Sequence, residues 1–317
     1  MKILIVSGFL GAGKTTFIKK MAEKTSHDLV VMENEYGEIE VDKTLLEEDR
    51  RLNIWELTEG CICCSMKSDF ASSVLTIANT LDPEYLIVEP TGAALLSNVI
   101  ANLRQIEYER ISLLSPVTVV DADGFDRCLA EYSDIFLDQL KAAGTIVISR
   151  RSFTSAEEAA PLISRLRSIN PFAPVQFEHY STLDGGWWET LLSTGLNGNR
   201  ILPPKQSATE IENLGLSGIS LPGPNHLIAF LEEVIRERYG QICRAKGFVE
   251  ASGCLLRFDI VGDHYTVTGF SGETLPKSVF IGENLNRNRL RKKLLADFQT
   301  DTKSIRINRP YPRFRSR

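Results

Sequence analysis

Residues Lys2–Thr16 combine side chains and a spacing that suit phosphate binding. An apolar run, Ile3–Val6, predicts a buried strand and leads into the pattern Gly-x4-Gly-Lys-Thr, after which a helical periodicity begins. Glycines let several backbone N–H groups approach one phosphate, the lysine reaches the β- and γ-phosphates, and the threonine ligates Mg²⁺. The start of the helix adds positive charge. The pattern predicts a nucleotide-binding loop with these contacting residues: Gly8, Gly11, Ala12, Gly13, Lys14, Thr15 and Thr16.

A carboxylate follows a second apolar run that is expected to be a strand. The run Leu86–Val88 leads to Glu89, and Gly92 follows shortly after. A nucleotide site uses a carboxylate at the end of a neighbouring strand to organise Mg²⁺ and its waters, and a glycine there lets the backbone approach the γ-phosphate. A strand that ends in Glu-Pro is by itself typical of an ordinary turn. Combined with the upstream loop, it favours a site in which Lys14 and Glu89 act in catalysis.

A cluster of cysteines lies after another expected strand, Ile54–Leu57. It consists of Cys61, Cys63 and Cys64, and we call it the CxCC cluster. Thiolates so close together can bind a soft or borderline divalent ion, with a further ligand from elsewhere or from water. The spacing differs from the CxxC knuckle of structural zinc ribbons, which favours an open, transient site. Buried structural cysteines and a redox pair are the alternatives.

Between the loop and the CxCC cluster lies the segment Asn34–Asp42, NEYGEIEVD, which is rich in carboxylates around a glycine. It follows an expected strand, as a nucleotide-dependent switch segment would. A solvated acidic loop is the alternative interpretation.

The composition limits the classes of function. The chain has 317 residues, of which 43% are hydrophobic and 24% charged, and its net charge is −5. This balance argues against general affinity for nucleic acids or membrane surfaces. Met1 leads straight into an expected strand, and no apolar run is long enough for a membrane span, so we expect a cytoplasmic protein. The cysteine cluster is not typical of a secreted disulfide framework.

The apolar runs after the loop do not alternate polar with apolar residues, which predicts strands buried on both faces. They are Leu29–Met32, Ile54–Leu57, Tyr85–Val88, Val117–Val120, Thr145–Ile148 and Val175–Phe177. Segments of helical pattern lie between many of them, at Ser68–Thr80, Ala94–Arg104, Phe125–Leu140 and Ala156–Ile169. The alternation predicts an α/β fold with a doubly wound, mainly parallel sheet, in which ligands bind at the carboxyl ends of the strands.

The composition changes near Ser193–Gln206, which is rich in Gly, Asn and Pro. We interpret residues 194–212 as a linker between a nucleotide-binding domain, 1–193, and a smaller α+β domain, 213–317. In the second domain a helix is expected at Asn225–Tyr239, before runs that predict an antiparallel sheet and a closing helix. The runs are Ala245–Glu250, Cys254–Val261, His264–Phe270 and Val279–Gly282, and the helix is Arg287–Phe298.

Several short segments form a characteristic set: SGFLGAGKTT, NEYGEIEVD, GCICC, VEPTG and, in the second domain, RAKGF at Arg244–Phe248. Together they resemble the CobW-type metallochaperone GTPases, a family that includes cobalt, zinc and nitrile-hydratase metal-insertion proteins. The resemblance spans both expected domains. It implies a GTPase domain of the signal-recognition and MinD-like class of P-loop proteins, followed by the C-terminal domain of that family.

The resemblance also implies roles for residues. The CxCC cluster would bind Zn²⁺, Co²⁺ or Ni²⁺ as cargo beside the nucleotide, and ligand type alone does not rank these metals. Thr15 would ligate Mg²⁺ and Glu89 would contact a Mg²⁺-bound water. Glu35 and Asp42 fall where switch carboxylates act near the metal or the attacking water. The expected partner is a client metalloprotein or a corrinoid-related protein, and the expected state is a monomer or a homodimer.

One segment departs from the family pattern. The guanine-reading sequence Asn-Lys-x-Asp should follow the strand Thr145–Ile148, where this chain has Ser149, Arg150, Arg151 and Ser152. A carboxylate accepts both N–H donors of guanine, and a serine hydroxyl cannot reproduce both bonds or the charge. Arg150 could still stack on the purine. We therefore expect GTP from the resemblance, with ATP or mixed use left open by the residues.

Two other classes of function fit parts of the pattern. A P-loop kinase acting on a small molecule would use the nucleotide loop but would not require the CxCC cluster. A regulatory module would bind a nucleotide and switch a partner without a metal or turnover.

Overall fold

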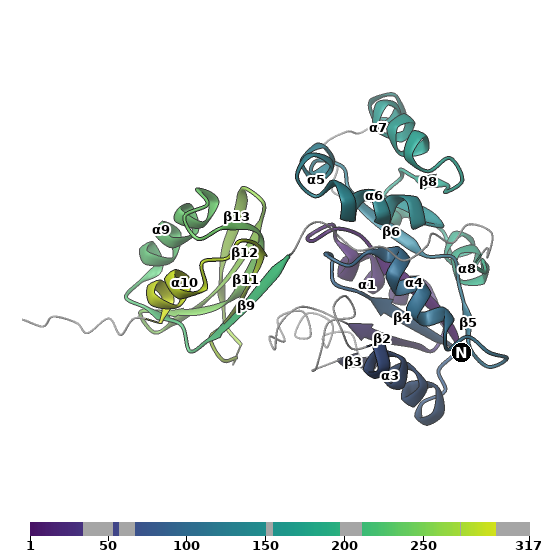
Figure 1. Ribbon diagram of the computed structural model, residues 1–317, viewed down its shortest axis with the longest axis horizontal. Coiled ribbons are helices and arrows are strands. Elements are labelled where there is room, and N and C mark those ends of the chain that lie inside the picture. Colours follow the sequence, from purple (N-terminus) through teal and green to yellow (C-terminus); the bar gives the residue numbers. More distant parts are fainter. Residues whose placement is uncertain (34–52, 57–66, 150–154, 197–210, 273, 296–317) are drawn as a thin grey trace, which may run out of the picture.

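The computed structural model describes residues 1–33, 53–56, 67–149, 155–196, 211–272 and 274–295. The chain forms two sheets that lie in separate parts of the molecule (Figure 1). The first sheet is parallel and flanked by helices, and the second is largely antiparallel. The predicted fold class, an α/β nucleotide-binding sheet with a smaller α+β domain, is confirmed.

The first sheet has the strand order β3-β2-β4-β1-β6-β7-β8, and β5 pairs with β1. All its pairs are parallel, so the carboxyl ends of its strands lie at one edge. The predicted strands are present with small shifts at their ends, and β5 is additional. Their bounds are Lys2–Ser7 for β1, Leu29–Glu33 for β2, Asn53–Glu56 for β3, Tyr85–Glu89 for β4, Ser112–Leu113 for β5, Val117–Asp121 for β6, Thr145–Ser149 for β7 and Val175–Gln176 for β8.

Helices cover both faces of this sheet (Figure 1). In β1, Leu4 and Val6 pack with α1 and α8, whereas Ile3 and Ile5 pack with α3 and α4. Burial on both faces explains why the strand is continuously apolar. No helix in the described part of the chain has the length and apolarity to cross a bilayer. The helices are α1 Lys14–Lys24, α3 Lys67–Thr80, α4 Leu96–Arg104, α5 Phe125–Glu131, α6 Ser133–Ala142, α7 Ala156–Ile169 and α8 Gly185–Ser193.

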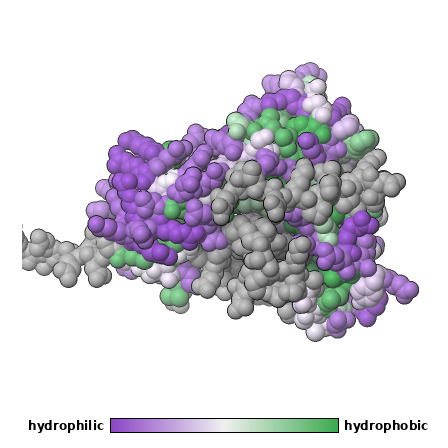
Figure 2. All heavy atoms as spheres, in the orientation of Figure 1, coloured by the Kyte–Doolittle hydropathy of each residue, from purple (hydrophilic) through white to green (hydrophobic). Residues whose placement is uncertain are grey.

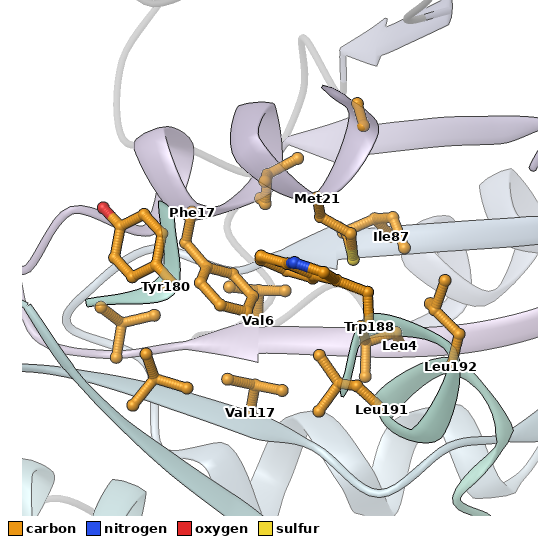
Figure 3. Close-up of a cluster of buried hydrophobic side chains, with 14 of the residues drawn as sticks. Leu4, Val6, Phe17, Met21, Ile87, Val117, Tyr180, Trp188, Leu191 and Leu192 are labelled. Carbon is orange, nitrogen blue, oxygen red and sulfur yellow. The ribbon is translucent and has the colours of Figure 1, made fainter. Parts of the chain in front are cut away.

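Helix α8 is absent from the elements predicted above. It begins after Asp184, whose side chain accepts a hydrogen bond from Trp187 N at 2.9 Å. Figure 3 shows Trp188 of this helix beside Phe17 and Met21 of α1. The ring centroids of Phe17 and Trp188 are 5.1 Å apart, and both side chains are fully buried. This packing fixes α1 and therefore the loop that precedes it.

The single helix predicted over Phe125–Leu140 is wrong. The segment forms two helices, α5 and α6, which are separated at Tyr132 with φ −126° and ψ 39°. The ring of Tyr132 packs on Phe9 of the nucleotide loop, with centroids 4.8 Å apart. Ser133 and Asp134, which follow, are residue types that favour a helix start. The contact with Phe9 is a tertiary interaction that helical periodicity does not reveal.

The second sheet has the order β13-β12-β11-β14-β9 with antiparallel neighbours, and β10 pairs with β11. Helices α9 and α10 pack on one face through Leu227, Phe230 and Leu290. Hydrophilic residues dominate the view of this domain in Figure 2. The predicted strands are present, β9 and β10 are additional, and α9 and α10 end earlier than predicted. The bounds are β9 Glu212–Ser217, β10 Ser220–Leu221, α9 Pro224–Ile235, β11 Gln241–Ala251, β12 Cys254–Val261, β13 His264–Phe270, β14 Lys277–Glu283 and α10 Arg287–Leu294.

The other face of the second sheet contacts the first domain. Val279, Ile281 and Cys243 lie in one apolar cluster with Phe9 and Leu10 of the nucleotide loop. Side chains alternate between the faces of a strand, so Val279 and Ile281 point away from α9 and α10, and Cys243 joins them at a bulge in β11 between Ile242 and Arg244. The contact places β11, β12 and β14 next to the loop.

Candidate functional site

The nucleotide loop needs glycine at defined positions. A Cβ on Gly8, whose φ is 143°, would lie 2.3 Å from the carbonyl oxygen of Val119 in β6. Gly13 precedes α1 in the left-handed region with φ 94°. Only glycine adopts both conformations without strain or a clash. The turn brings the start of α1 back beside the end of β1.

Lys14 lies in the loop with 8% of its surface exposed. Its Nζ donates a hydrogen bond to the carbonyl oxygen of Gly8 at 3.2 Å, so the ammonium group spans the loop. Backbone N–H groups at the start of α1 converge on the same region. A cation, a helix N-terminus and a tight glycine turn together form a site suited to phosphate.

Thr15 and Glu89 meet at the tip of β4. Thr15 Oγ1 lies 3.0 Å from Oε1 and 3.2 Å from Oε2 of Glu89. Parallel pairing of β1 with β4 brings the end of β4 beside the loop. A hydroxyl and a carboxylate are hard oxygen ligands, the class that Mg²⁺ prefers. This pair of side chains could hold Mg²⁺, directly through Thr15 and through water at Glu89.

The segment after β4 is held against the loop. A Cβ on Gly92 would lie 2.5 Å from Leu10 N, so the two backbones are in close contact. The buried side chain of Gln139 in α6 donates through Nε2 to the carbonyl oxygens of Gly92 at 3.0 Å and Ala94 at 2.9 Å. Gln139 therefore ties the segment after Glu89 to α6. Gln139 was not among the predicted site residues, because its burial, which indicates that its amide is hydrogen-bonded, is known only from the structure.

Ser149 lies at the end of β7 and is buried. Its hydroxyl is within hydrogen-bonding distance of the carbonyl oxygens of Ala12 and Val120, the latter at 3.2 Å. The side chain thus braces the nucleotide loop, and its contact with a base stays a prediction. The predicted stacking residue, Arg150, and the rest of 150–154 lie outside the described residues.

The predicted metal ligands and one predicted catalytic carboxylate lie outside the described residues: Cys61, Cys63, Cys64, Glu35 and Asp42. The strands that lead to them are described. β2 ends at Glu33 and β3 at Glu56, and the register pairs Glu33 with both Glu56 and Glu89. Both strands therefore end at the sheet edge that carries the nucleotide loop. Within the described ranges, no group of three or more His, Cys, Asp or Glu side chains is placed to hold a metal ion.

A charged residue of the second domain lies beside the loop. Arg244 of β11 pairs with Asp259 of β12, with Nη1–Oδ1 at 2.5 Å and Nη2–Oδ2 at 3.0 Å, and its side chain is 12% exposed. A Cβ on Gly11 would lie 3.5 Å from Arg244 Nη1 and 2.9 Å from Val261 Cγ1. No role was predicted for Arg244, because its proximity to the loop depends on the contact between the domains.

Two thiols near this contact are poor metal ligands. Burial raises the pKa of Cys128 to about 11 and that of Cys243 to about 12. Metals bind the thiolate, and both groups stay protonated at neutral pH. These cysteines therefore do not replace the CxCC cluster as candidate ligands.

Two family models match the chain. The model described as "CobW/HypB/UreG, nucleotide-binding domain" matches residues 2–177, and "Cobalamin synthesis protein cobW C-terminal domain" matches residues 222–296. The first match covers more than half of the chain and contains the loop, Glu89, Gln139 and Ser149.

Curated relatives give the same assignment. The chain is 27% identical over 300 residues to the zinc chaperone CobW of a Sinorhizobium species, covering 80% of this chain and 82% of the relative. It is 32% identical over 192 residues to the zinc chaperone YjiA of Escherichia coli, covering 58% and 59%. It is 26% identical over 191 residues to the zinc-regulated GTPase metalloprotein activator 1 of Schizosaccharomyces pombe, covering 57% and 46%. The matches to the last two relatives thus span about half of each relative's length. The chain belongs to the CobW/HypB/UreG family and carries the cobW C-terminal domain.

Proposed function

We propose that the chain is a GTP-hydrolysing metallochaperone. It would bind a divalent transition metal through the CxCC cluster and deliver it to a client protein or a corrinoid-related system. One observation carries the proposal: the nucleotide loop, Glu89 and the ends of β2 and β3 share one edge of a parallel sheet. In the sequence, the predicted metal ligands follow these two strand ends. Relatives named as zinc chaperones support Zn²⁺ as cargo, and Co²⁺ and Ni²⁺ suit the same ligands.

The nucleotide would bind with its phosphates in the loop. Backbone N–H groups of Gly11, Ala12 and Gly13 would contact the phosphates, and Lys14 would leave Gly8 O to reach the outer two. Thr16 would contact the inner phosphate. Relatives described as GTPases support GTP, and the base would lie beyond β7, near Ser149 and Arg150.

Mg²⁺ fits the oxygen ligands at the tip of β4. Thr15 would ligate it directly, and Glu89 would hold one of its waters. When bound, the ion neutralises charge on the outer phosphates. The hydrogen bond that now joins Thr15 to Glu89 keeps both groups positioned for this role.

Hydrolysis would proceed by attack of water on the γ-phosphorus. The new bond joins the water oxygen to phosphorus, and the bond from phosphorus to the bridging oxygen breaks, leaving GDP and inorganic phosphate. The water's proton passes to the phosphate product. We assign the orientation of the water to Asp42, and charge stabilisation to Lys14 and the loop.

Release of the γ-phosphate would change the conformation of the segment after β4. Gly92 lies against Leu10, and Gln139 holds the carbonyl oxygens of Gly92 and Ala94. Loss of the γ-phosphate would alter this contact and the switch segment Asn34–Asp42, so that the metal site opens. The cargo, held by the CxCC cluster and Glu35 as a thiolate complex, would then pass to the client.

Two domains would divide this work. We propose a nucleotide-binding domain over 1–193, a linker over 194–212 and a C-terminal domain over 213–317. Leu196 N donates to Leu113 O of the first sheet at 3.0 Å and β9 begins the second sheet at Glu212, so the residues between Leu196 and Glu212 join the two sheets. We propose a monomer or a homodimer whose partner is the client protein.

The test is the affinity for Zn²⁺ with a non-hydrolysable GTP analogue, with GDP and without nucleotide. We expect binding at least about 10-fold tighter in the triphosphate state. Cys63→Ser should abolish this binding, and Cys254→Ser is the matched control, because Cys254 is exposed in β12. Equal affinity in all three states would falsify the proposal. The same measurement with an ATP analogue establishes the preference for the base.

A further inference from the structure

The face of the second sheet that meets the nucleotide loop carries cationic residues. Opposite residues of β11 and β12 lie on the same face, and the register pairs Arg244 with Val261, and Lys246 with Asp259. Lys246 is 2% exposed and the Arg244 side chain 12%. Helices α9 and α10 pack on the opposite face. Both cations therefore lie largely buried on the face that is turned toward the first domain, and Arg244 is the one whose guanidinium group lies beside Gly11 of the loop.

Burial of an arginine is unfavourable unless its charge is compensated. Asp259 compensates Arg244 through a bidentate pair that uses one N–H of Nη1 and one of Nη2, and Nη1 also donates to the carbonyl oxygen of Ile260 at 3.5 Å. A guanidinium group has five N–H donors, so these contacts orient the group and leave Nε–H and one N–H of Nη2 for a second ligand. Arg244 is thus held in a fixed orientation by one carboxylate, a typical arrangement for an arginine that recognises phosphate.

The position of the group indicates which ligand it could reach. Nη1 lies 3.5 Å from the place of a Cβ on Gly11, within the loop whose N–H groups and Lys14 suit phosphates. Val261 contacts the same glycine, and Val279 and Ile281 pack with Phe9 and Leu10. The second sheet therefore packs directly against Phe9, Leu10 and Gly11 of the nucleotide loop.

We propose that Arg244 contacts the outer phosphate of a nucleoside triphosphate in the loop, with Asp259 as its positioning residue. The C-terminal domain would thus help to distinguish a bound triphosphate from a bound diphosphate. The phosphates of the bound nucleotide would in turn affect the position of this domain. This inference rests on the proposed nucleotide binding. It adds a phosphate-contacting residue from the second domain to those of the loop.

The test compares Arg244→Ala and Arg244→Lys with the full-length parent chain. Kd is measured for a non-hydrolysable GTP analogue and for GDP, and kcat and KM for GTP hydrolysis. We expect Arg244→Ala to weaken analogue binding by about 10- to 100-fold and to leave GDP binding nearly unchanged. Arg244→Lys should recover part of the loss, since it keeps the charge without the planar fork. Retained GDP binding shows that each variant is folded.

Arg127→Ala is the matched control. Arg127 Nη1 pairs with Asp263 Oδ1 at 3.1 Å across the same contact between the domains, and Arg127 is not among the nearest neighbours of Gly8, Gly11 or Gly13. If Arg244 acts only by docking the domains, Arg127→Ala will reproduce the selective loss, and the proposal is overturned. Equal weakening of the analogue and GDP, or no change in either, overturns it as well. A parent chain that binds neither nucleotide removes the proposed function and this inference together, whereas normal binding by Arg244→Ala removes the inference alone.

Discussion

Thr15 Oγ1 lies 3.0 Å from a carboxylate oxygen of Glu89, although the two residues are 74 positions apart in the chain. The hydrogen bond joins the first turn of α1 to the tip of β4, the neighbour of β1 in the sheet. It places a hydroxyl and a carboxylate at one point beside the phosphate loop. The parallel pairing of β1 with β4 thus brings together the two side chains that could hold Mg²⁺.

Glu89→Gln tests that pair. The amide keeps the shape and a hydrogen bond to Thr15 but lacks the charge that would organise a Mg²⁺-bound water. We expect kcat for GTP hydrolysis to fall about 100-fold with little change in Kd for the nucleotide. Steady-state kinetics over a Mg²⁺ titration measure this. Normal turnover in the variant would exclude Glu89 from the metal site.

Gly8→Ala tests the turn of the loop. The new Cβ would meet Val119 O at 2.3 Å, in a conformation with φ 143° that side chains rarely adopt. We expect the free energy of unfolding to fall by more than about 2 kcal/mol, with loss of nucleotide binding. Urea denaturation measures the change. Gly195→Ala is the control, because nothing lies within 4 Å of a Cβ there and its φ is not in the left-handed region.

Gln139→Leu tests the tie to the segment after β4. The substitution leaves the carbonyl oxygens of Gly92 and Ala94 without their buried donor. We expect a loss of about 2–4 kcal/mol in the free energy of unfolding and slower hydrolysis, since the segment contacts the loop. Gln176→Leu, in β8, is the control, because its amide makes only an exposed 3.4 Å contact with Glu178 O. Equal stability of the two variants would argue against the tie.

His27 predicts a pH dependence of stability. Its ring nitrogens lie 2.9 Å from Glu189 and from Glu84. The hydrogen bond with Glu189, followed by the contacts with Glu84, raises the pKa of His27 above its usual value near 6.5. A raised folded-state pKa stabilises the protein below the unfolded pKa, and this stabilisation is lost as pH rises through the folded pKa. The carboxylates are exposed, so we expect less than about 1 kcal/mol.

The measurement is the free energy of unfolding from about pH 5.5 to about pH 8.5, a range that extends roughly one unit or more on either side of the usual histidine pKa. His27→Gln should remove the loss of stability over that range. An identical pH profile in the variant would assign the dependence to other groups.

The sequence was sufficient to predict the strands of the first sheet and the phosphate loop, because continuous apolar runs and the glycine pattern are local signals. The antiparallel sheet was predicted for the same reason, and His264–Phe270 and Cys254–Val261 match the structure in both bounds. Other features depend on contacts distant in the sequence. Helix α8 is stabilised by the packing of Trp188 on Phe17, and the break at Tyr132 accompanies its contact with Phe9.

The site shows the same division. Lys14, Thr15 and Glu89 were predicted from their residue types and their places after strands. Gln139 and Arg244 were not assigned a role. Gln139 donates to backbone carbonyl oxygens of a segment distant in the sequence, and Arg244 reaches the loop from the second domain. Ser149 was predicted to contact the base because it aligns with a base-reading segment. In the structure its hydroxyl donates to the carbonyl oxygen of Ala12 in the loop.

The packing of Phe9 and Leu10 has a consequence for shortened forms of the protein. Their side chains belong to an apolar cluster that β14 completes. A chain that stopped before β9 would expose this cluster to water. Phe9 and Leu10 would then lose the packing that stabilises the conformation of the nucleotide loop. The first domain should therefore bind nucleotide less tightly in isolation than within the whole molecule, even though every residue of the loop belongs to it.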